Sequence, residues 1–190
     1  MLVGTEHQVL IGSLLGDAHL YKGLAKAAFR ENHSAKQLDY LAWKVGQLPS
    51  LRLRLKEAQD GSPYATSLKL ESLYSYYSLF YGVKGKHIPW ALMGELEALG
   101  LAVWVADDGC MHTRGRTIRL ATCCFTYEEH IQLLQFFESQ FGLRPRIDPI
   151  SNRRGYHLVF PVAETKRLVQ LIEPHMPSCM AYKLAIKPYK

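Results

Sequence analysis

The chain has 190 residues, of which 48% are hydrophobic and 21% are charged, as is usual for a folded globular protein. This length allows one domain with a substantial core, and the longest apolar run is far shorter than the ~20 residues of a membrane-spanning helix. The net charge of +6 favours an anionic partner, with nucleic acid ahead of a membrane surface.

The N-terminal segment and the cysteines predict an intracellular protein. The start, MLVGTEHQVL, has no basic segment followed by an apolar one, so it does not look like a secretory signal. Cys110, Cys123, Cys124 and Cys179 form no CxxC pair and two of them are adjacent, which indicates reduced thiols. Cys110 and His112 lack a second matching pair, so a zinc site is not favoured. A prokaryotic cytoplasm and an organelle matrix fit equally well.

The first half of the chain predicts a helix, two strands, a helix, two strands and a helix. The apolar run VLIGSLLGDAHL predicts a buried helix that ends near Asp17. Two short β-compatible stretches follow, and an amphipathic helix then begins with Ser34 as its expected N-cap. Alternation predicts strands from Leu51 and Tyr64, with leucines on one face and basic residues on the other, namely Arg52, Arg54 and Lys56. The segment SLYSYYSLF predicts the last helix of this half.

The second half repeats this order. The apolar run ALGLAVWVADDGCMH predicts a second buried helix, which ends near Asp108. The stretch CMHTRGRTIRLATCCF predicts a hairpin that turns near Gly115. Thr126 begins a Thr-x-x-Glu capping box for the next helix, and Gly142 is its expected C-cap. LRPRID and YHLVFPV predict two further strands, and ETKRLVQLI predicts the closing helix.

The repeat predicts one α+β domain over residues 1–190, with two pseudo-symmetric αββαββα halves at about 1–92 and 93–190. Small residues in both apolar helices would let them pack closely, so that Asp17 and Asp108 meet at one place. Two neighbouring carboxylates repel each other unless one is protonated or a cation lies between them, and oxygen ligands suit Mg²⁺. A sheet surface rich in Arg and Lys beside them would suit a phosphate backbone.

The segments LIGSLLGDAHL and LAVWVADDGC resemble the two motifs of the LAGLIDADG homing endonucleases, above all the single-chain, intron-encoded members. The resemblance covers nearly the whole chain, through FRENHSAKQLDYLAWK, KGKHIPWAL, FTYEEHIQLLQFF and IEPHMPSCMAYKL. It implies halves packed through the motif helices, a saddle-shaped β-surface for DNA, and a monomer with a long asymmetric duplex target. The implied reaction is hydrolysis of one phosphodiester in each strand with Mg²⁺, or with Mn²⁺ as a substitute.

The resemblance also implies how divalent metals are held. Asp17 and Asp108 would be the metal-binding acids at the two helix ends. The backbone carbonyls of Gly16 and Asp107 would supply further ligands. The side chain of Asp107, one position earlier, is expected to point elsewhere.

Four more positions receive roles from the resemblance. The basic residues near the acids would be Lys86 in KHIP and Lys183 in AYKL, which would stabilise charge on the phosphate or orient the attacking water. Many relatives place a water-holding glutamine where this chain has His33 and Cys123. A thiol orders water poorly, so one strand is expected to be cut more slowly.

Basic and aromatic residues on the strands and loops are candidates for DNA contacts, because β-ribbons enter the major groove and arginine pairs with guanine. The candidates are Tyr21, Lys22, Lys26, Arg30, Arg52, Arg54, Lys69, His112, Arg114, Arg116, Arg119, Arg144, Arg146, Arg153 and Arg154. The arginine-rich loop at 152–155 is expected to touch phosphates.

Other functions stay open. Proteins of this kind can also act as RNA maturases that assist splicing of an intron RNA, or as DNA-binding proteins without cleavage. The presence of both acids argues against a non-cleaving protein. His33 and Cys123, which stand where many relatives have glutamine, argue for one. A metal-dependent phosphatase for small molecules would fit the acids but not the basic strands, and it would lack a steep salt dependence of DNA affinity.

Overall fold

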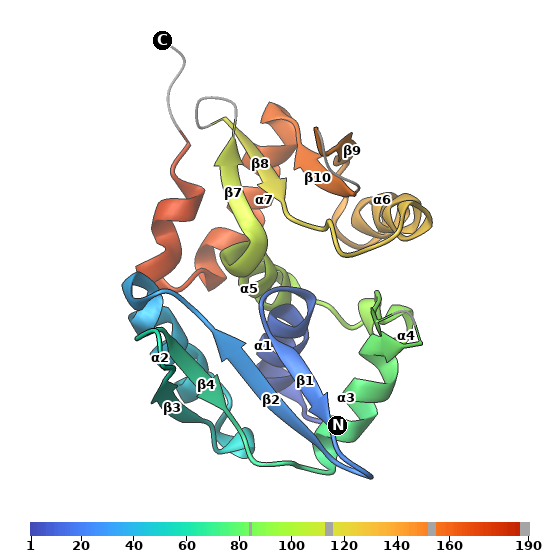
Figure 1. Cartoon of the computed structure of the whole chain (residues 1–190). Helices are drawn as coiled ribbons and strands as arrows, with labels where there is room; N and C mark the ends of the chain where they lie inside the picture. The colour runs from blue at the N-terminus through green and yellow to red at the C-terminus, as the bar shows by residue number, and fades with distance from the viewer. Residues whose placement is uncertain (84, 113–115, 152–154, 187–190) are drawn as a thin grey trace.

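Two similar halves meet at a central pair of helices in the computed structural model of the chain (Figure 1). The structure describes residues 1–83, 85–112, 116–151 and 155–186. The expected turn at Gly115 and the candidate DNA contacts Arg114, Arg153 and Arg154 lie outside these ranges. In the described part of the chain, none of the helices has both the length and the apolar character that a bilayer crossing requires.

The first half contains one antiparallel sheet in the strand order β1-β2-β4-β3, with helices on one face. Its elements in chain order are α1 (Gly4–Leu15), β1 (His19–Lys22), β2 (Ala27–Asn32), η1 (Ala35–Gln37), α2 (Leu38–Gln47), η2 (Pro49–Leu51), β3 (Arg54–Glu57), β4 (Pro63–Thr66) and α3 (Ser72–Phe80). A short connection leads to the second half through β5 (Tyr81–Gly82), β6 (Gly85–Lys86) and α4 (Trp90–Met93).

The second half contains the equivalent sheet in the order β7-β8-β10-β9. Its elements are α5 (Ala98–Asp108), β7 (Gly109–His112), β8 (Thr117–Leu120), α6 (Tyr127–Phe141), β9 (Arg146–Pro149), β10 (Tyr156–Phe160), α7 (Val162–Ile172), η3 (Glu173–His175) and η4 (Ser178–Leu184). Both halves therefore follow the order αββαββα, which confirms the predicted α+β fold.

The helices α1 and α5 pack against each other with almost no side-chain layer between them. A Cβ atom on Gly12 would lie 2.8 Å from the Cβ of Val103 and would also strike the carbonyl oxygen of Gly100. A Cβ on Gly100 would lie 2.8 Å from Oε1 of Gln8. Both helices are buried nearly all round, which explains why their sequences are apolar on every face. Glycine at the contact lets the two backbones touch.

Each sheet has one face on the core and one open face. Along β2 the side chains of Ala27, Phe29 and Glu31 are buried, and those between them point to the other face. In the second sheet, Leu120 and Leu158 are paired and buried on the core side. The period of two predicted for the strands is therefore present, and it decides which polar residues reach the open face.

Of two local expectations in the first half, one holds in part and the other is wrong. Ser34 is the N-cap residue of the 3₁₀ turn η1, which runs directly into α2 at Leu38, but its side chain makes no capping hydrogen bond to the backbone. The strand expected from Leu51 begins at Arg54, since η2 occupies the preceding residues and Arg52 has a left-handed φ of 48°. All four residues of β3 are exposed, including Leu55, so this edge strand has no leucine face in the core.

The helix α6 is bounded as its sequence predicts. Thr126 accepts a hydrogen bond from the backbone N–H of Glu129, and the Glu129 side chain accepts one from the backbone N–H of Thr126. At the other end Gly142 has φ 64°, a conformation that glycine adopts without strain. Both signals are local in sequence, which is why they can be read without the fold.

Replacing Gly12 by valine should destabilise the protein by about 3 kcal/mol or more, because added atoms would push the two helix backbones apart. The matched control is Gly46→Ala on α2, where a Cβ would meet nothing within 4 Å. It should be neutral or stabilising by up to about 1 kcal/mol, since alanine favours helix. Urea unfolding followed by circular dichroism measures both changes. Equal stabilities for the two variants would contradict the close helix contact.

Candidate active site

The two motif helices end at one point because their axes are held so close together. Asp17 follows the end of α1 and Asp108 is the last residue of α5. Burial, and then the charges of Asp17 and Asp107, raise the pKa of Asp108 to about 7. The charge of Asp17, just after one motif helix, thus acts on Asp108 at the end of the other.

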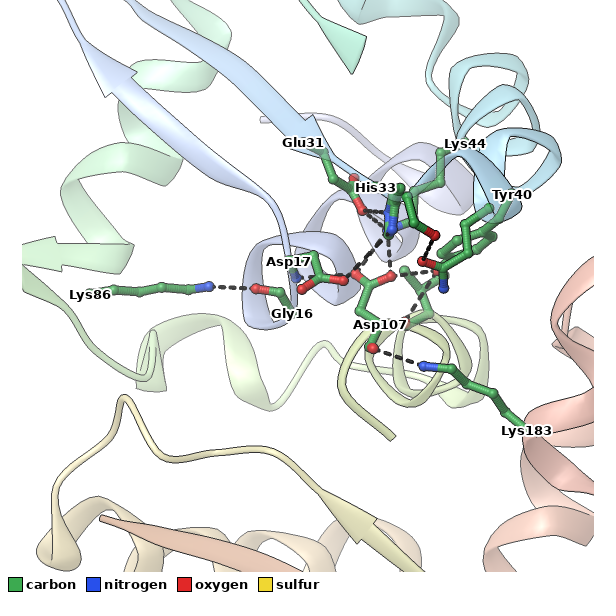
Figure 2. Close-up of polar contacts among 12 residues, drawn as sticks. Gly16, Asp17, Glu31, His33, Tyr40, Lys44, Lys86, Asp107 and Lys183 are labelled. Atoms are coloured by element: carbon green, nitrogen blue, oxygen red, sulfur yellow. Dashed lines mark hydrogen bonds and ion pairs between the residues drawn. The ribbon is translucent and has the colours of Figure 1, made fainter. Parts of the chain in front are cut away.

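A lysine from each half binds a backbone carbonyl just before each acid (Figure 2). Lys86 donates from Nζ to the carbonyl oxygen of Gly16 at 2.8 Å, and Lys183 donates to that of Asp107 at 2.9 Å. Burial lowers the pKa of both lysines. The two lysines approach from opposite sides (Figure 2). Their partners are equivalent, because Gly16 directly precedes Asp17 and Asp107 directly precedes Asp108. The structure thus places Lys86 and Lys183 at matching positions in the two halves.

The side chain of Asp107 does not point away from the acids, in contrast to the expectation. It is buried beside Asp17, whose backbone N–H lies 3.4 Å from its Oδ2. It occupies space that glycine leaves free, because a Cβ on Gly16 would lie 2.5 Å from the Asp107 Cβ. A glycine on one motif helix and an aspartate on the other thus interlock at the same level.

Asp107 is held by α2, an element of the other half (Figure 2). Lys44 donates from Nζ to its two carboxylate oxygens at 2.7 and 2.8 Å, and the Tyr40 hydroxyl donates to Oδ1 at 2.7 Å. Lys44 also donates to the buried carboxylate of Glu31. A buried charge is tolerated only when it is paired in this way.

The charges of this buried group support one another. Burial opposes the charge on Lys44, but Asp107 and Glu31 outweigh it and raise the pKa of Lys44. Burial likewise opposes the charge on Glu31, but Lys44 and His33 outweigh it and lower the pKa of Glu31. The ammonium and the Glu31 carboxylate therefore stay ionised at neutral pH.

Sequence reasoning missed Glu31, Tyr40 and Lys44. The available signal was the pattern of α2, in which Tyr40, Leu41 and Lys44 fall on one helix face and are all buried. A lysine on the apolar face of an amphipathic helix needs a buried anion. The identity of that anion depends on the fold, because Asp107 is 63 residues away.

His33 and Cys123 have very different surroundings. The side chain of His33 is only 2% exposed, its Nε2 lies 2.7 Å from Oε1 of Glu31, and its Nδ1 lies 3.9 Å from Oδ2 of Asp17. Burial opposes its charge, but Glu31 outweighs burial and raises the pKa of His33. Cys123 instead lies beside Gly155. Its neighbour Cys124 is the thiol near Lys86 and Asp108, and desolvation raises the pKa of Cys124 to about 11.

These groups have the chemistry of a cation site. One ligand atom each from Asp17, His33 and Asp107 lies within 4.8 Å of the others. Burial and neighbouring carboxylates raise the pKa of Asp107 to about 7, although the charge of Lys44 opposes this shift. The same two causes raise the pKa of Asp108 to about 7. A divalent cation would relieve this repulsion, so the donor set fits a metal that binds oxygen ligands.

About half of the described DNA-contact candidates lie on the open faces of the sheets. Strand register places Arg30 and Arg54 on the same face as Thr66, and the Arg30 guanidinium lies 4.1 Å from the centroid of the Tyr64 ring. Arg119 pairs across the second sheet with Cys110, in a position equivalent to that of Arg30. The candidates on the open faces are Tyr21, Arg30, Arg54, His112, Arg119 and Arg146.

The remaining described candidates lie elsewhere. Lys22 faces α3, with Nζ 5.9 Å from the centroid of the Tyr77 ring. Arg144 donates to Glu138 of α6 at 2.8 Å, on the helical side of the second sheet. The other four candidates lie at turns and strand ends, namely Lys26, Arg52, Lys69 and Arg116. Among them, Lys26 forms an ion pair with Glu71 at 3.5 Å.

Comparison with known proteins identifies the family of this site. A model of the LAGLIDADG DNA endonuclease family matches residues 7–168. The fold is similar to that of the homing endonuclease I-WcaI bound to its DNA recognition sequence, with a TM-score of 0.83 and 20% identity over 99% of this chain and 89% of that one.

Curated relatives carry several names. A protein named RecA from Mycobacterium shimoidei is 28% identical over 97% of this chain and 47% of its own length. A probable intron-encoded DNA endonuclease 3 from Mycosarcoma maydis is 28% identical over 59% of this chain and 82% of its own. The cytochrome b mRNA maturase bI2 of Saccharomyces cerevisiae is 24% identical over 93% and 46%. The chain thus spans about half the length of the first of these relatives.

Replacing Asp108 by asparagine should stabilise the metal-free protein at pH 8 by about 2 to 4 kcal/mol and leave it almost unchanged at pH 4. The folded pKa of about 7 lies above the ordinary value of 3.8, so the folded state binds more protons between these values and loses stability as pH rises through them. Asparagine removes this penalty. Urea unfolding with a chelator present, at both pH values, measures it, and the same change at pH 4 and pH 8 would contradict the shift.

Proposed function

This chain belongs to the LAGLIDADG DNA endonuclease family, and we propose from this premise that it is a homing endonuclease. It would hydrolyse one phosphodiester in each strand of a long asymmetric DNA site with divalent metal ions. One observation carries the proposal: Asp17 and Asp108 lie at the ends of two helices that pack against each other, and each directly follows a residue whose carbonyl is bound by a lysine. A structural or purely binding role does not require this duplicated arrangement.

Asp17 and Asp108 would hold the metal ions, together with the backbone carbonyls of Gly16 and Asp107. Each carbonyl oxygen has two lone pairs, so the hydrogen bond from a lysine leaves one for a cation. Mg²⁺ suits such an oxygen-rich site, with Mn²⁺ as a substitute. When bound, the metal would lower the pKa of the attacking water and balance charge on the leaving oxygen.

Lys86 and Lys183 would stabilise the negative charge on the phosphate in each half. Their hydrogen bonds to the carbonyls fix the two ammonium groups next to the acids without further reorganisation. His33 lies on the Asp17 side, while the second half offers the thiols of Cys123 and Cys124. Since thiols order water poorly, we expect the two strands to be cut at unequal rates.

The open faces of the two sheets would bind the duplex, and the structurally similar I-WcaI is itself bound to its DNA recognition sequence. Arginines on these faces would pair with guanines in the major groove or with phosphates. Both motifs are present in one chain, so a monomer would complete the site. The two halves differ in sequence, which suits an asymmetric target.

A second candidate function is supported by the maturase bI2 relative. A chain of this fold could assist splicing of an intron RNA, with or without DNA cleavage. Splicing of a host intron in vitro, with and without the protein, separates this function from cleavage.

Cleavage of a randomised duplex library in Mg²⁺, with sequencing of the ends and a Ca²⁺ control, tests the proposed function. Breaks should occur at one long motif and disappear in Asp17→Asn and Asp108→Asn, while Lys86→Met should slow them about 10²- to 10³-fold. Asp39→Asn, an exposed acid on α2, is the matched control and should cut normally. Cleavage retained in Asp108→Asn would overturn the assignment, and specific binding without breaks would favour the maturase or non-cleaving alternative.

Two nearby arginines test which face binds DNA. Arg146→Ala, on the open face of the second sheet, should weaken duplex binding and lower the slope of log affinity against log salt by about 1. Arg144→Ala, whose partner is Glu138 on the helical side, should leave that slope unchanged. Fluorescence anisotropy at several salt concentrations measures both. Equal slopes for the two variants would contradict the placement of DNA on the open face.

A further inference from the structure

We propose that His33 is itself a metal ligand through Nδ1, so that the two halves of the site hold chemically different metal positions. The inference rests on the proposed function and adds a nitrogen donor to the oxygen donors described above. It assigns to the Asp17 side a histidine–carboxylate position that the Asp108 side lacks.

The position of Nδ1 fits a ligand better than a hydrogen-bonding group. Its distance of 3.9 Å to Oδ2 of Asp17 is too long for a hydrogen bond. Two donor atoms that each lie about 2.1 Å from one metal ion are typically about 3 to 4 Å apart. A divalent ion therefore fits between the imidazole of His33 and the carboxylate of Asp17.

The other ring nitrogen fixes the state and the direction of the imidazole. Oε1 of Glu31 accepts from the Lys44 ammonium, and Nε2 of His33 lies 2.7 Å from the same oxygen, which matches a ring that carries its proton on Nε2 and donates it to the carboxylate. In the neutral ring this leaves Nδ1 with a free lone pair, 3.9 Å from Oδ2 of Asp17. A carboxylate behind a histidine is the usual support of a metal-binding imidazole, because it sets the tautomer and raises the basicity of the ligand.

The surrounding side chains keep this arrangement rigid. The His33 ring packs edge-on against Tyr40, with the ring centroids 5.3 Å apart. Lys44 holds Glu31 on one side and Asp107 on the other. The oxygens of Asp107 are already occupied by Lys44 and Tyr40, so Asp107 adds negative charge at the third corner instead of a direct bond.

The second half has no equivalent nitrogen donor among its described residues. The strand register makes Arg119 equivalent to Arg30, so the position equivalent to His33 holds Thr122, and the thiols of Cys123 and Cys124 follow it. His130 has its Nε2 2.8 Å from the Thr122 hydroxyl and its Nδ1 2.6 Å from the Thr126 carbonyl. Both its ring nitrogens are engaged, so the Asp108 side remains an oxygen-ligand position.

An imidazole ligand changes the metal preference of one position. Nitrogen donors favour Mn²⁺ and Co²⁺ over Mg²⁺ and Ca²⁺, which take oxygen ligands. The Asp17 side should therefore bind Mn²⁺ more tightly than the Asp108 side, whereas Mg²⁺ should distinguish the two sides much less.

Pulsed electron paramagnetic resonance of the full chain with Mn²⁺ alone tests the assignment. The bound ion should show the ¹⁴N coupling of one directly bound imidazole, replaced by a ¹⁵N coupling after labelling of histidine, which leaves the fold unchanged. His33→Gln should abolish the coupling and raise the Kd for Mn²⁺ about tenfold or more. The matched control is His175→Gln, an exposed histidine of η3, which should keep the coupling.

The outcomes separate this inference from the proposed function. Mn²⁺ bound with oxygen ligands only, or a nitrogen coupling that survives His33→Gln, overturns the inference even if DNA is cut. Absence of Mn²⁺ binding that depends on Asp17 also overturns it, because both donors are in place without DNA. A histidine-bound ion in a protein that cuts no DNA would support the inference and refute the proposed endonuclease.

Discussion

The contact between the backbones of α1 and α5 determines where the other parts of the molecule lie. Glycines at Gly12 and Gly100 remove the side-chain layer that normally separates two helices. The helix ends therefore converge, and the first strand of each sheet begins just after them, β1 at His19 and β7 at Gly109. Core packing and the meeting of the acids are consequences of the same segments.

A buried ionic cluster joins the halves beside this contact. Lys44 of the first half binds Asp107 of the second half and Glu31 of its own sheet. Such clusters rarely add net stability, because the cost of removing the charges from water offsets their attraction. Their effect is specific: Lys44 has its partners only when α2 and α5 are in the correct register. The cluster also orients His33 next to Asp17 and so links the alignment of the halves to the site.

The fold and the symmetric part of the site could be predicted from the sequence, because they are repeated in it. Asp17 and Asp108, and likewise Lys86 and Lys183, occur in matching contexts, and the structure places each pair at matching positions. The asymmetric part was missed, because the partners of Asp107 come from a distant helix. Strand alternation with Tyr21 places Lys22 on the opposite face of β1, where its ammonium lies near the Tyr77 ring. For Arg52 no local pattern indicated the left-handed turn that precedes β3.

The interlock of Gly16 with Asp107 has a consequence for how this architecture can be assembled. The two positions face each other across the helix pair, and one is empty of side chain where the other fills the space. A dimer of two first halves would place glycine against glycine and leave a void the size of an aspartate side chain. A dimer of two second halves would force two buried carboxylates into the space of one. It would also lack α2 of the first half, whose Lys44 binds and neutralises Asp107 in this chain. Each half is thus complementary to the other and not to itself, so the covalent link between them preserves a pairing that neither could reproduce with its own copy.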